Sequence, residues 1–162
     1  MKTVTILFFI TLLLFAGSTY SQGKPNSLYF ELLGNGGIYS VNYDRLFTGN
    51  IGGRIGIMYL SELDIIVSSF QDLLIIPVTI NYLVGSGNNK LEFGAGVVYV
   101  HISGGEFFGL GFNEGSGTLG TATIGYRYQQ TDGGLLFRIG FTPVFSPEGL
   151  LPMGGISLGT SF

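Results

Sequence analysis

The chain has 162 residues, and only 10% of them are Asp, Glu, Lys or Arg, whereas ordinary soluble domains carry about 25%. A net charge of −3 without basic clusters argues against nucleic acid as a partner. The chain contains no Cys, which excludes disulfides, thiolate chemistry and a lipidated N-terminal cysteine.

Residues 1–21 have the pattern of a secretory signal peptide. Lys2 supplies the positive charge, residues 6–16 form an apolar run, and small residues then offer a cleavage site before Gln22. A membrane anchor is the alternative, but the run is shorter than the roughly 20 residues that a spanning helix needs. The length of the remainder, 22–162, predicts one domain.

Eight segments with alternating bulky and small residues follow, and each approaches the about 9–11 tilted residues of a membrane-spanning strand. We predict strands at 26–34, 37–47, 51–60, 72–84, 90–102, 118–130, 134–145 and 153–162. The longest apolar stretch, 73–84, contains Pro77, Thr79 and Asn81, so it does not predict a spanning helix. A chain too apolar for water and without spanning helices favours an all-β fold, a closed antiparallel eight-stranded transmembrane β-barrel.

Turn sequences fix the register of three predicted hairpins. Loops at Asn35-Gly36, at 48–50 and at Asp132-Gly133 set bulky residues opposite bulky residues in each case. The predicted pairs are Phe30 with Val41, Leu32 with Tyr39, Tyr43 with Ile55, Phe47 with Ile51, Tyr126 with Ile139, and Ile124 with Phe141.

The connections between the strands alternate between short and long, as periplasmic turns and outer loops do in membrane barrels. We therefore expect 61–71, 103–117 and 146–152 to lie outside the cell, with both ends of the mature chain in the periplasm. The short 34–37 turn is an exception, because the strand count places it outside.

The two faces of the predicted strands differ in size. Val78, Ile80 and Tyr82 represent the bulky face. The opposite face carries Gly52, Gly56, Gly94, Gly96, Thr121, Thr123, Gly125, Gly140 and Thr142. A lipocalin-like soluble barrel is the alternative, with its apolar face inside. Its outer face should be rich in Lys, Glu and Asp, so the small residues instead predict a narrow interior and a bulky face in lipid.

The charged residues on the small face balance one another. They are Glu31, Asp44 and Glu92 against Arg54, Arg127 and Arg138. The registers place Asp44 opposite Arg54, which we expect to be its partner, and Arg127 opposite Arg138. Glu92 is expected near Arg127, where it could bridge both guanidinium groups. Because Arg stays charged and binds carboxylates at two points, we expect a packed polar core; a narrow ion path or a proton-linked site is the alternative.

Two motifs allow a functional interpretation. The segment 115–120 matches G-x-G-x-x-G, but a dinucleotide site needs a strand before it and a helix after it. His101, the only His, lies near Ser103 and Glu106, so it belongs either to a hydrogen-bonded rim or to a nucleophilic site. No base–nucleophile spacing is evident, and no His, Cys, Asp and Glu cluster has metal-ligand spacing. We therefore predict no catalytic, cofactor-binding or metal-ligating residue and no enzyme activity.

The segment 103–117 is the most unusual of the expected outer loops. It carries Phe107, Phe108 and Phe112 among glycines. These rings either form a patch for a partner or for the lipopolysaccharide surface, or fold over the mouth of the barrel.

The last predicted strand alternates large residues with Gly and Ser over 155–162 and ends on Phe162. It resembles the closing strand of Gram-negative outer-membrane β-barrel proteins. Stretches similar to small eight-stranded members occur at 27–37, 39–43, 125–128 and 133–138. The resemblance implies an outer-membrane location after export by the general secretory route. It also implies outer-membrane lipids, periplasmic chaperones and the barrel-assembly machinery as partners.

The resemblance implies no substrate. We expect a monomer with a structural or surface-interaction role, and not a wide pore. The alternatives are an outer-membrane lipid-modifying enzyme with a rim site near His101, or a narrow ion path.

Overall fold

The computed structural model describes residues 23–65, 68–103, 115–147 and 149–162. The predicted signal peptide, 1–21, lies outside these residues. The elements of the described part are β1 (Asn26–Leu33), a 3-10 turn η1 (Gly34–Gly36), β2 (Tyr39–Leu46), β3 (Ile51–Ile65), β4 (Ser68–Ser86), β5 (Asn89–Ser103), β6 (Gly115–Gln129), β7 (Gly134–Phe141), β8 (Val144–Ser146), β9 (Gly149–Leu151) and β10 (Gly154–Ser161).

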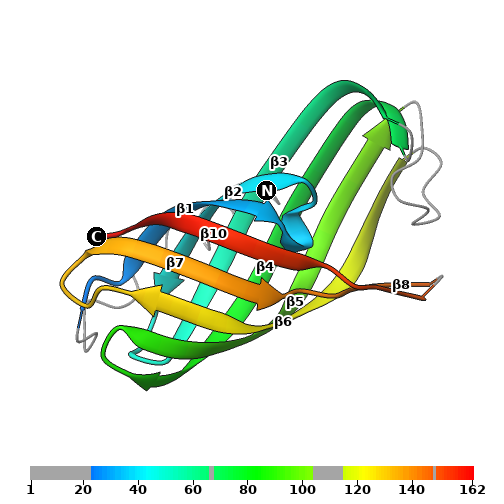
Figure 1. Cartoon of the computed structure of the whole chain (residues 1–162). Coiled ribbons are helices and arrows are strands. Elements are labelled where there is room, and N and C mark those ends of the chain that lie inside the picture. Colours follow the sequence, from blue (N-terminus) through cyan, green and yellow to red (C-terminus); the bar gives the residue numbers. More distant parts are fainter. Residues whose placement is uncertain (1–22, 66–67, 104–114, 148) are drawn as a thin grey trace, which may run out of the picture.

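The strands close into a barrel (Figure 1). Within the described residues, each of β1 to β6 pairs with the next strand, β7 pairs with β10, and β10 returns to β1, so eight antiparallel strands form the wall. Where the eight strands close on one another, no edge is open and backbone groups are satisfied without water. The predicted all-β, closed eight-stranded antiparallel barrel is confirmed.

The predicted hairpin registers are also confirmed. The β1–β2, β2–β3 and β6–β7 ladders pair Phe30 with Val41, Leu32 with Tyr39, Tyr43 with Ile55, Tyr126 with Ile139, and Ile124 with Phe141. The amide of Phe47 donates to the carbonyl of Ile51 at 2.8 Å, as that pair requires.

The connections expected to lie outside the cell differ from the prediction. The expected loop 61–71 is mostly strand, because β3 continues to Ile65 and β4 begins at Ser68. The expected loop 103–117 is shortened, because β5 ends at Ser103 and β6 begins at Gly115. Both extensions pass beyond the apolar band, so the hydrophobic pattern that located the strands stops before the pairing does.

The predicted seventh strand, 134–145, is also wrong at its end. Strand β7 stops at Phe141, and Pro143, which has no amide hydrogen to donate to a ladder, follows closely. The chain then forms the short β8–β9 hairpin, which begins inside the predicted strand and continues through most of the expected loop 146–152, and β8 pairs with β6. Strand β2 likewise begins at Tyr39 and not at 37, because the η1 turn intervenes.

The barrel wall has two heights. Strands β3, β4, β5 and β6 have 15, 19, 15 and 15 residues, whereas β1, β2, β7 and β10 have 8 each. Pairing with β2 reaches Ile57 of β3, and from Met58 onward β3 pairs with β4 alone. Figure 1 shows these four strands rising beyond the others at the end opposite the C-terminus. We call this part the tall wall.

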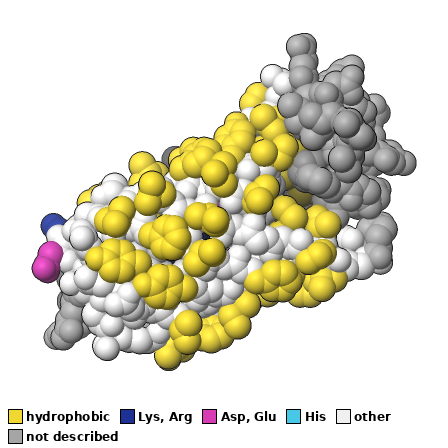
Figure 2. All heavy atoms as spheres, in the orientation of Figure 1, with side chains coloured by type: hydrophobic (Ala, Val, Ile, Leu, Met, Phe, Trp, Pro, Cys, Tyr) yellow, Lys and Arg dark blue, Asp and Glu magenta, His cyan; other side chains and the backbone are white. Residues whose placement is uncertain are grey.

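Large apolar side chains cover the outside of the barrel (Figure 2). Ile80 is 67% exposed and Leu158 is 60% exposed, while the residues next to them in sequence face inward. Exposed Tyr side chains lie toward both ends of the wall, with Tyr82 and Tyr126 near the short turns and Tyr59 and Tyr99 near the other end. This arrangement confirms the outward bulky face and excludes the lipocalin-like alternative. Within the described residues, no helix is long and apolar enough for a membrane span.

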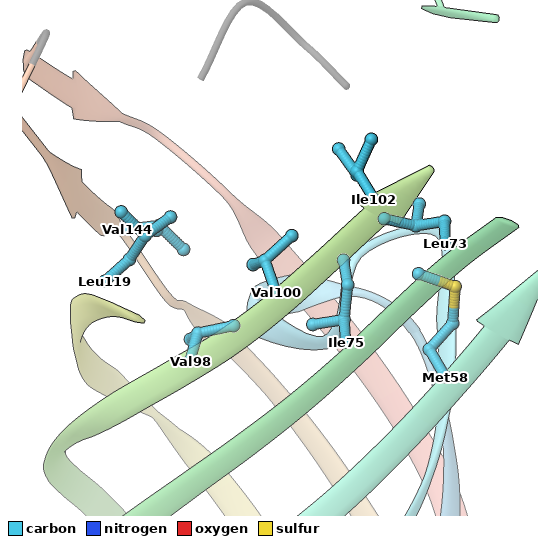
Figure 3. Close-up of a cluster of buried hydrophobic side chains, with 8 residues drawn as sticks. All are labelled: Met58, Leu73, Ile75, Val98, Val100, Ile102, Leu119 and Val144. Atoms are coloured by element: carbon cyan, nitrogen blue, oxygen red, sulfur yellow. The ribbon is translucent and has the colours of Figure 1, made fainter. Parts of the chain in front are cut away.

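The interior changes character along the barrel. Near the short turns it is polar, but toward the tall wall it holds an apolar cluster that the sequence analysis did not predict (Figure 3). The cluster consists of Met58, Leu73, Ile75, Val98, Val100, Ile102, Leu119 and Val144, all at most 5% exposed. These side chains fill the space between the polar interior and the mouth at the tall wall.

Candidate functional site

Six charged side chains from six strands meet inside the barrel. They are Glu31 on β1, Asp44 on β2, Arg54 on β3, Glu92 on β5, Arg127 on β6 and Arg138 on β7, and each is at most 5% exposed. Every one lies on the inward face because strand side chains alternate between faces. The three positive and three negative charges therefore neutralise one another inside a narrow space.

Arg127 and Asp44 form one centre of this network. The Arg127 NH2 group donates to Asp44 Oδ1 at 3.0 Å, and NH1 donates to Oδ2 at 3.2 Å. Asn81 Nδ2 also donates to Asp44 Oδ2, at 3.2 Å. The Arg127 NH1 group lies 3.8 Å from Glu92 Oε1. Such a two-point contact is the strong arrangement for Arg and a carboxylate.

Arg138 and Glu92 form the second centre. Arg138 Nε donates to Glu92 Oε2 at 2.7 Å, and NH2 donates to Oε1 at 2.8 Å. Because Glu92 also faces Arg127, the predicted bridging of two guanidinium groups by Glu92 is confirmed.

Tyr29 joins the network, although the sequence analysis did not single it out. Its hydroxyl accepts from Arg138 NH1 at 2.5 Å, and its ring lies 4.8 Å from the Arg138 guanidinium carbon and 5.6 Å from that of Arg54. Arg54 binds Glu31 and donates through Nε to Asn42 Oδ1 at 2.9 Å. The sequence did contain a signal for this position. Tyr29 and Glu31 are two residues apart on β1, and such residues share a face of the strand.

The expected pairing of Asp44 with Arg54 is wrong. The two residues are opposite each other in the β2–β3 register, as predicted. However, Asp44 binds Arg127 from the far wall and Arg54 binds Glu31. The cause is the length of the Arg side chain. It reaches across the narrow barrel and binds a carboxylate on a non-adjacent strand.

The polar interior is packed. A small void of about 10 Å³ in it touches Glu92, Arg138, Thr123 and Thr142. The hydroxyls of Thr123 and Thr142 have no hydrogen-bond partner among the described residues, and a void of this size holds about one water. Together with the apolar cluster above it, this packing supports the predicted polar core and not a continuous ion path.

A second polar group lies on the outward face near the tall wall. His101 Nδ1 is 2.8 Å from Ser116 Oγ, and the Tyr99 hydroxyl donates to the same Oγ at 3.0 Å. Alongside, Asp72 accepts from the Tyr59 hydroxyl at 2.7 Å and from Ser103 Oγ at 3.4 Å. We call the first three residues, Tyr99, His101 and Ser116, the rim cluster.

The rim cluster differs from the group of His101, Ser103 and Glu106 that the sequence analysis considered. Ser103 bonds Asp72 and is not joined to His101, and Glu106 lies outside the described residues. The serine that contacts His101 is Ser116, which the β5–β6 register sets directly opposite it. Sequence reasoning missed Ser116 because the length of the connecting loop does not fix the register of that hairpin.

Two other sequence features are now placed. The G-x-G-x-x-G segment, 115–120, lies within β6 and opens no helix, so it lacks the context of a dinucleotide site. Phe107, Phe108 and Phe112 lie outside the described residues, so their two interpretations stay open.

No protein-family model matches the chain, and no curated protein matches it. Among solved structures, the N-terminal β-barrel domain of Pseudomonas aeruginosa OprF is similar, with a TM-score of 0.62 and 14% identity over 86% of this chain and 99% of that one. Ail, the attachment invasion locus protein of Yersinia pestis, is similar with a TM-score of 0.51 and 11% identity, over 86% of this chain and 97% of that one. The chain therefore has the fold of the small eight-stranded outer-membrane β-barrels.

Proposed function

We propose that this protein is an integral outer-membrane β-barrel with a structural or surface-interaction role. The observation that carries the proposal is an apolar exterior around a filled interior. The exposed apolar side chains suit lipid, because a monomeric soluble protein rarely exposes so large a continuous apolar surface. The interior charges pair with one another within the barrel. They therefore link strands of the wall and do not line an open channel.

The tall wall supports the surface-interaction part of the proposal. In the inferred topology it projects from the outer side of the membrane, since the short turns lie at the other end. One structural neighbour is described as an attachment invasion locus protein, and by analogy we propose that the tall wall and segment 103–117 contact a partner. Outer-membrane lipids, periplasmic chaperones and the barrel-assembly machinery are the further partners that this location entails.

A pull-down from cell-surface preparations tests the interaction role. Wild-type protein should retain a surface component that a variant lacking 104–114 does not, and the closed barrel should still form in that variant. Equal recovery with both proteins would contradict a role for this segment. Single-channel recording on the refolded protein should show no large stable conductance, and such a conductance would contradict the filled interior.

The rim cluster favours a second candidate function, a lipid-modifying enzyme. With His101 unprotonated at Nδ1, Ser116 Oγ could lose its proton to His101 while attacking a lipid ester carbonyl. The acyl group would pass to Ser116, the departing alcohol would take the proton, and water would then hydrolyse the acyl-enzyme. Among the described side chains, no carboxylate contacts His101 to orient it, and this is why the non-enzymatic role is our first proposal.

Mass spectrometry of lipids incubated with the refolded protein separates the two candidates. Our first proposal expects identical lipid profiles for wild type, His101→Ala and Ser116→Ala. A deacylated product that disappears in both variants would establish the enzyme instead. Ser103→Ala is the matched control, because Ser103 bonds Asp72 and not His101.

A further inference from the structure

A cavity of about 690 Å³ opens at the end of the barrel that carries the short turns. It is distinct from the charged interior and from the rim cluster. Its wall includes Lys24, Leu46, Asn50, Lys90, Gln129 and Thr131, which come from the segment before β1 and from the β2–β3, β4–β5 and β6–β7 hairpins. Small-molecule sites typically enclose roughly 300–1,000 Å³. We call this cavity the turn basin.

Hydrogen bonds between separate segments fix the mouth of the turn basin. The Lys24 amide donates to the carbonyl of Thr131 at 2.9 Å, which joins the segment before β1 to the β6–β7 turn. Asn50 Nδ2 donates to the carbonyl of Leu83 at 2.7 Å, which joins the β2–β3 turn to β4. A mouth that is already ordered lowers the entropy lost when a ligand binds.

The turn basin carries positive charge without internal neutralisation. Lys24 is exposed and Lys90 is half-buried, and among the described residues neither forms an ion pair. Among the described residues, no Asp or Glu belongs to the lining, and Asp132 lies in the adjoining turn. This contrasts with the barrel interior, where each Arg faces a carboxylate. The basin therefore favours an anion.

Gln129 forms part of the floor and lacks one hydrogen bond. It is 3% exposed, and its Nε2 donates to the Lys24 carbonyl at 3.3 Å and to Ser27 Oγ at 3.5 Å. Its Oε1 has no donor among the described residues. A buried amide oxygen without a donor is costly, because its bonds to water are lost without replacement. A ligand that brings an N–H to this floor would supply the missing bond.

We propose that the turn basin binds a peptide whose terminal carboxylate lies next to an amide N–H. The carboxylate accepts from the ammonium groups of Lys24 and Lys90, and the amide N–H donates toward Gln129 Oε1. The short turns face the periplasm in the inferred topology. Two sources supply this chemistry there, the stem peptides of the cell wall and the free C-termini of periplasmic proteins.

Calorimetric titration of the mature chain, 22–162, in lipid nanodiscs tests the proposal. The probe is N-acetyl-dialanine, and the matched probe is its C-terminal amide, which keeps the N–H but removes the charge. We expect the acid to bind at least about tenfold more tightly than the amide, the ratio that one charge-assisted hydrogen bond provides. Equal affinities, or no binding of the acid, would overturn the proposal.

Variants locate the site. Lys24→Gln and Lys90→Gln should each weaken binding of the acid by about tenfold, whereas Asp132→Asn, at the same end but outside the lining, should not weaken it. Unchanged binding in both Lys variants would overturn the site. A salt titration of the wild type needs no variant: affinity should fall as ionic strength rises, and salt-independent affinity would contradict the proposal.

The source of the peptide is tested with a soluble disaccharide–tetrapeptide fragment of the cell wall. Tighter binding of this fragment than of N-acetyl-dialanine would assign the basin to cell-wall peptides. Equal binding would assign it to C-terminal peptides in general. Both results support the shared chemistry, and rejection of both ligands would refute it.

Discussion

Arg127 on β6 binds Asp44 on β2 across the interior of the barrel, through two hydrogen bonds of 3.0 and 3.2 Å. The two side chains are fully buried, and their strands are not neighbours in the sheet. The pair therefore links opposite parts of the wall, a role that pairing between adjacent strands does not fill.

Removing one partner of this pair should destabilise the barrel strongly. Arg127→Ala leaves Asp44 as an uncompensated buried charge, which costs about 3–5 kcal/mol of unfolding free energy. Asp44→Asn combined with Arg127→Gln should recover much of that loss, as measured by urea unfolding in lipid vesicles. The control cycle pairs Asp44→Asn with Arg54→Gln, and we expect a smaller coupling because Arg54 binds Glu31. A larger coupling between Asp44 and Arg54 would contradict the geometry.

Close backbone approach makes Gly125 sensitive to substitution. A Cβ there would lie 2.6 Å from the carbonyl oxygen of Ile139 and 2.8 Å from the Cα of Gly140, so β6 and β7 would have to separate. We expect Gly125→Ala to cost about 1–3 kcal/mol in the same unfolding assay. Gly49→Ala is the control, because no atom lies within 4 Å of its added Cβ. Equal stability of both variants would show that the strands accommodate the methyl group.

Phe162 offers a test of assembly separate from stability. Its backbone pairs with Asn26 at 2.8 and 3.2 Å, while its side chain is 51% exposed. Phe162→Ala should therefore cost less than the about 3–5 kcal/mol of a buried Phe. If the terminal aromatic is read during assembly, the variant should accumulate unfolded in the periplasm although it refolds normally in vitro. Normal levels of heat-modifiable protein in the outer membrane would contradict that role.

Interactions that are set locally along the chain could be predicted from the sequence, whereas interactions across the barrel could not. Hairpin registers such as Phe30 with Val41 were predictable because a short turn fixes them locally. The partner of Asp44 was not, because it depends on which long side chain crosses the lumen. The apolar cluster was also missed. Parity with Gly96 places Val98 on the inward face, but only the closed barrel brings it together with Met58 and Leu119 from other strands.

The wall extensions were missed for a different reason. Strand β3 continues past Leu60 through alternating polar and apolar residues, and a search for lipid-facing strands stops where the apolar pattern weakens. Backbone pairing with β4 nevertheless continues to Ile65. The turn basin could not be predicted from the sequence either, because its lining comes from turns that become neighbours only when the barrel closes.

The inferred topology is tested by protease treatment of intact cells. We expect cleavage within 103–117 or 146–152, and protection of the turn around Gly87. Extension of β3 and β4 predicts that 61–71 resists cleavage, because paired strands do not enter a protease site readily. Permeabilised cells are the control, in which the Gly87 turn becomes accessible. Cleavage at this turn in intact cells would reverse the orientation.

The central claim is that the bulky face of the barrel contacts lipid, and spin labelling of β4 and β5 tests it most directly. The chain has no Cys, so single-Cys variants at Val78, Ile80 and Val97 can be labelled without background, with Gly87 as the water-exposed control. In lipid vesicles, oxygen should broaden the spectra of labels at the three wall positions, and a water-soluble nickel complex should not. The label at Gly87 should show the reverse. Strong broadening of all three wall labels by the nickel complex would place this face in water and contradict the account.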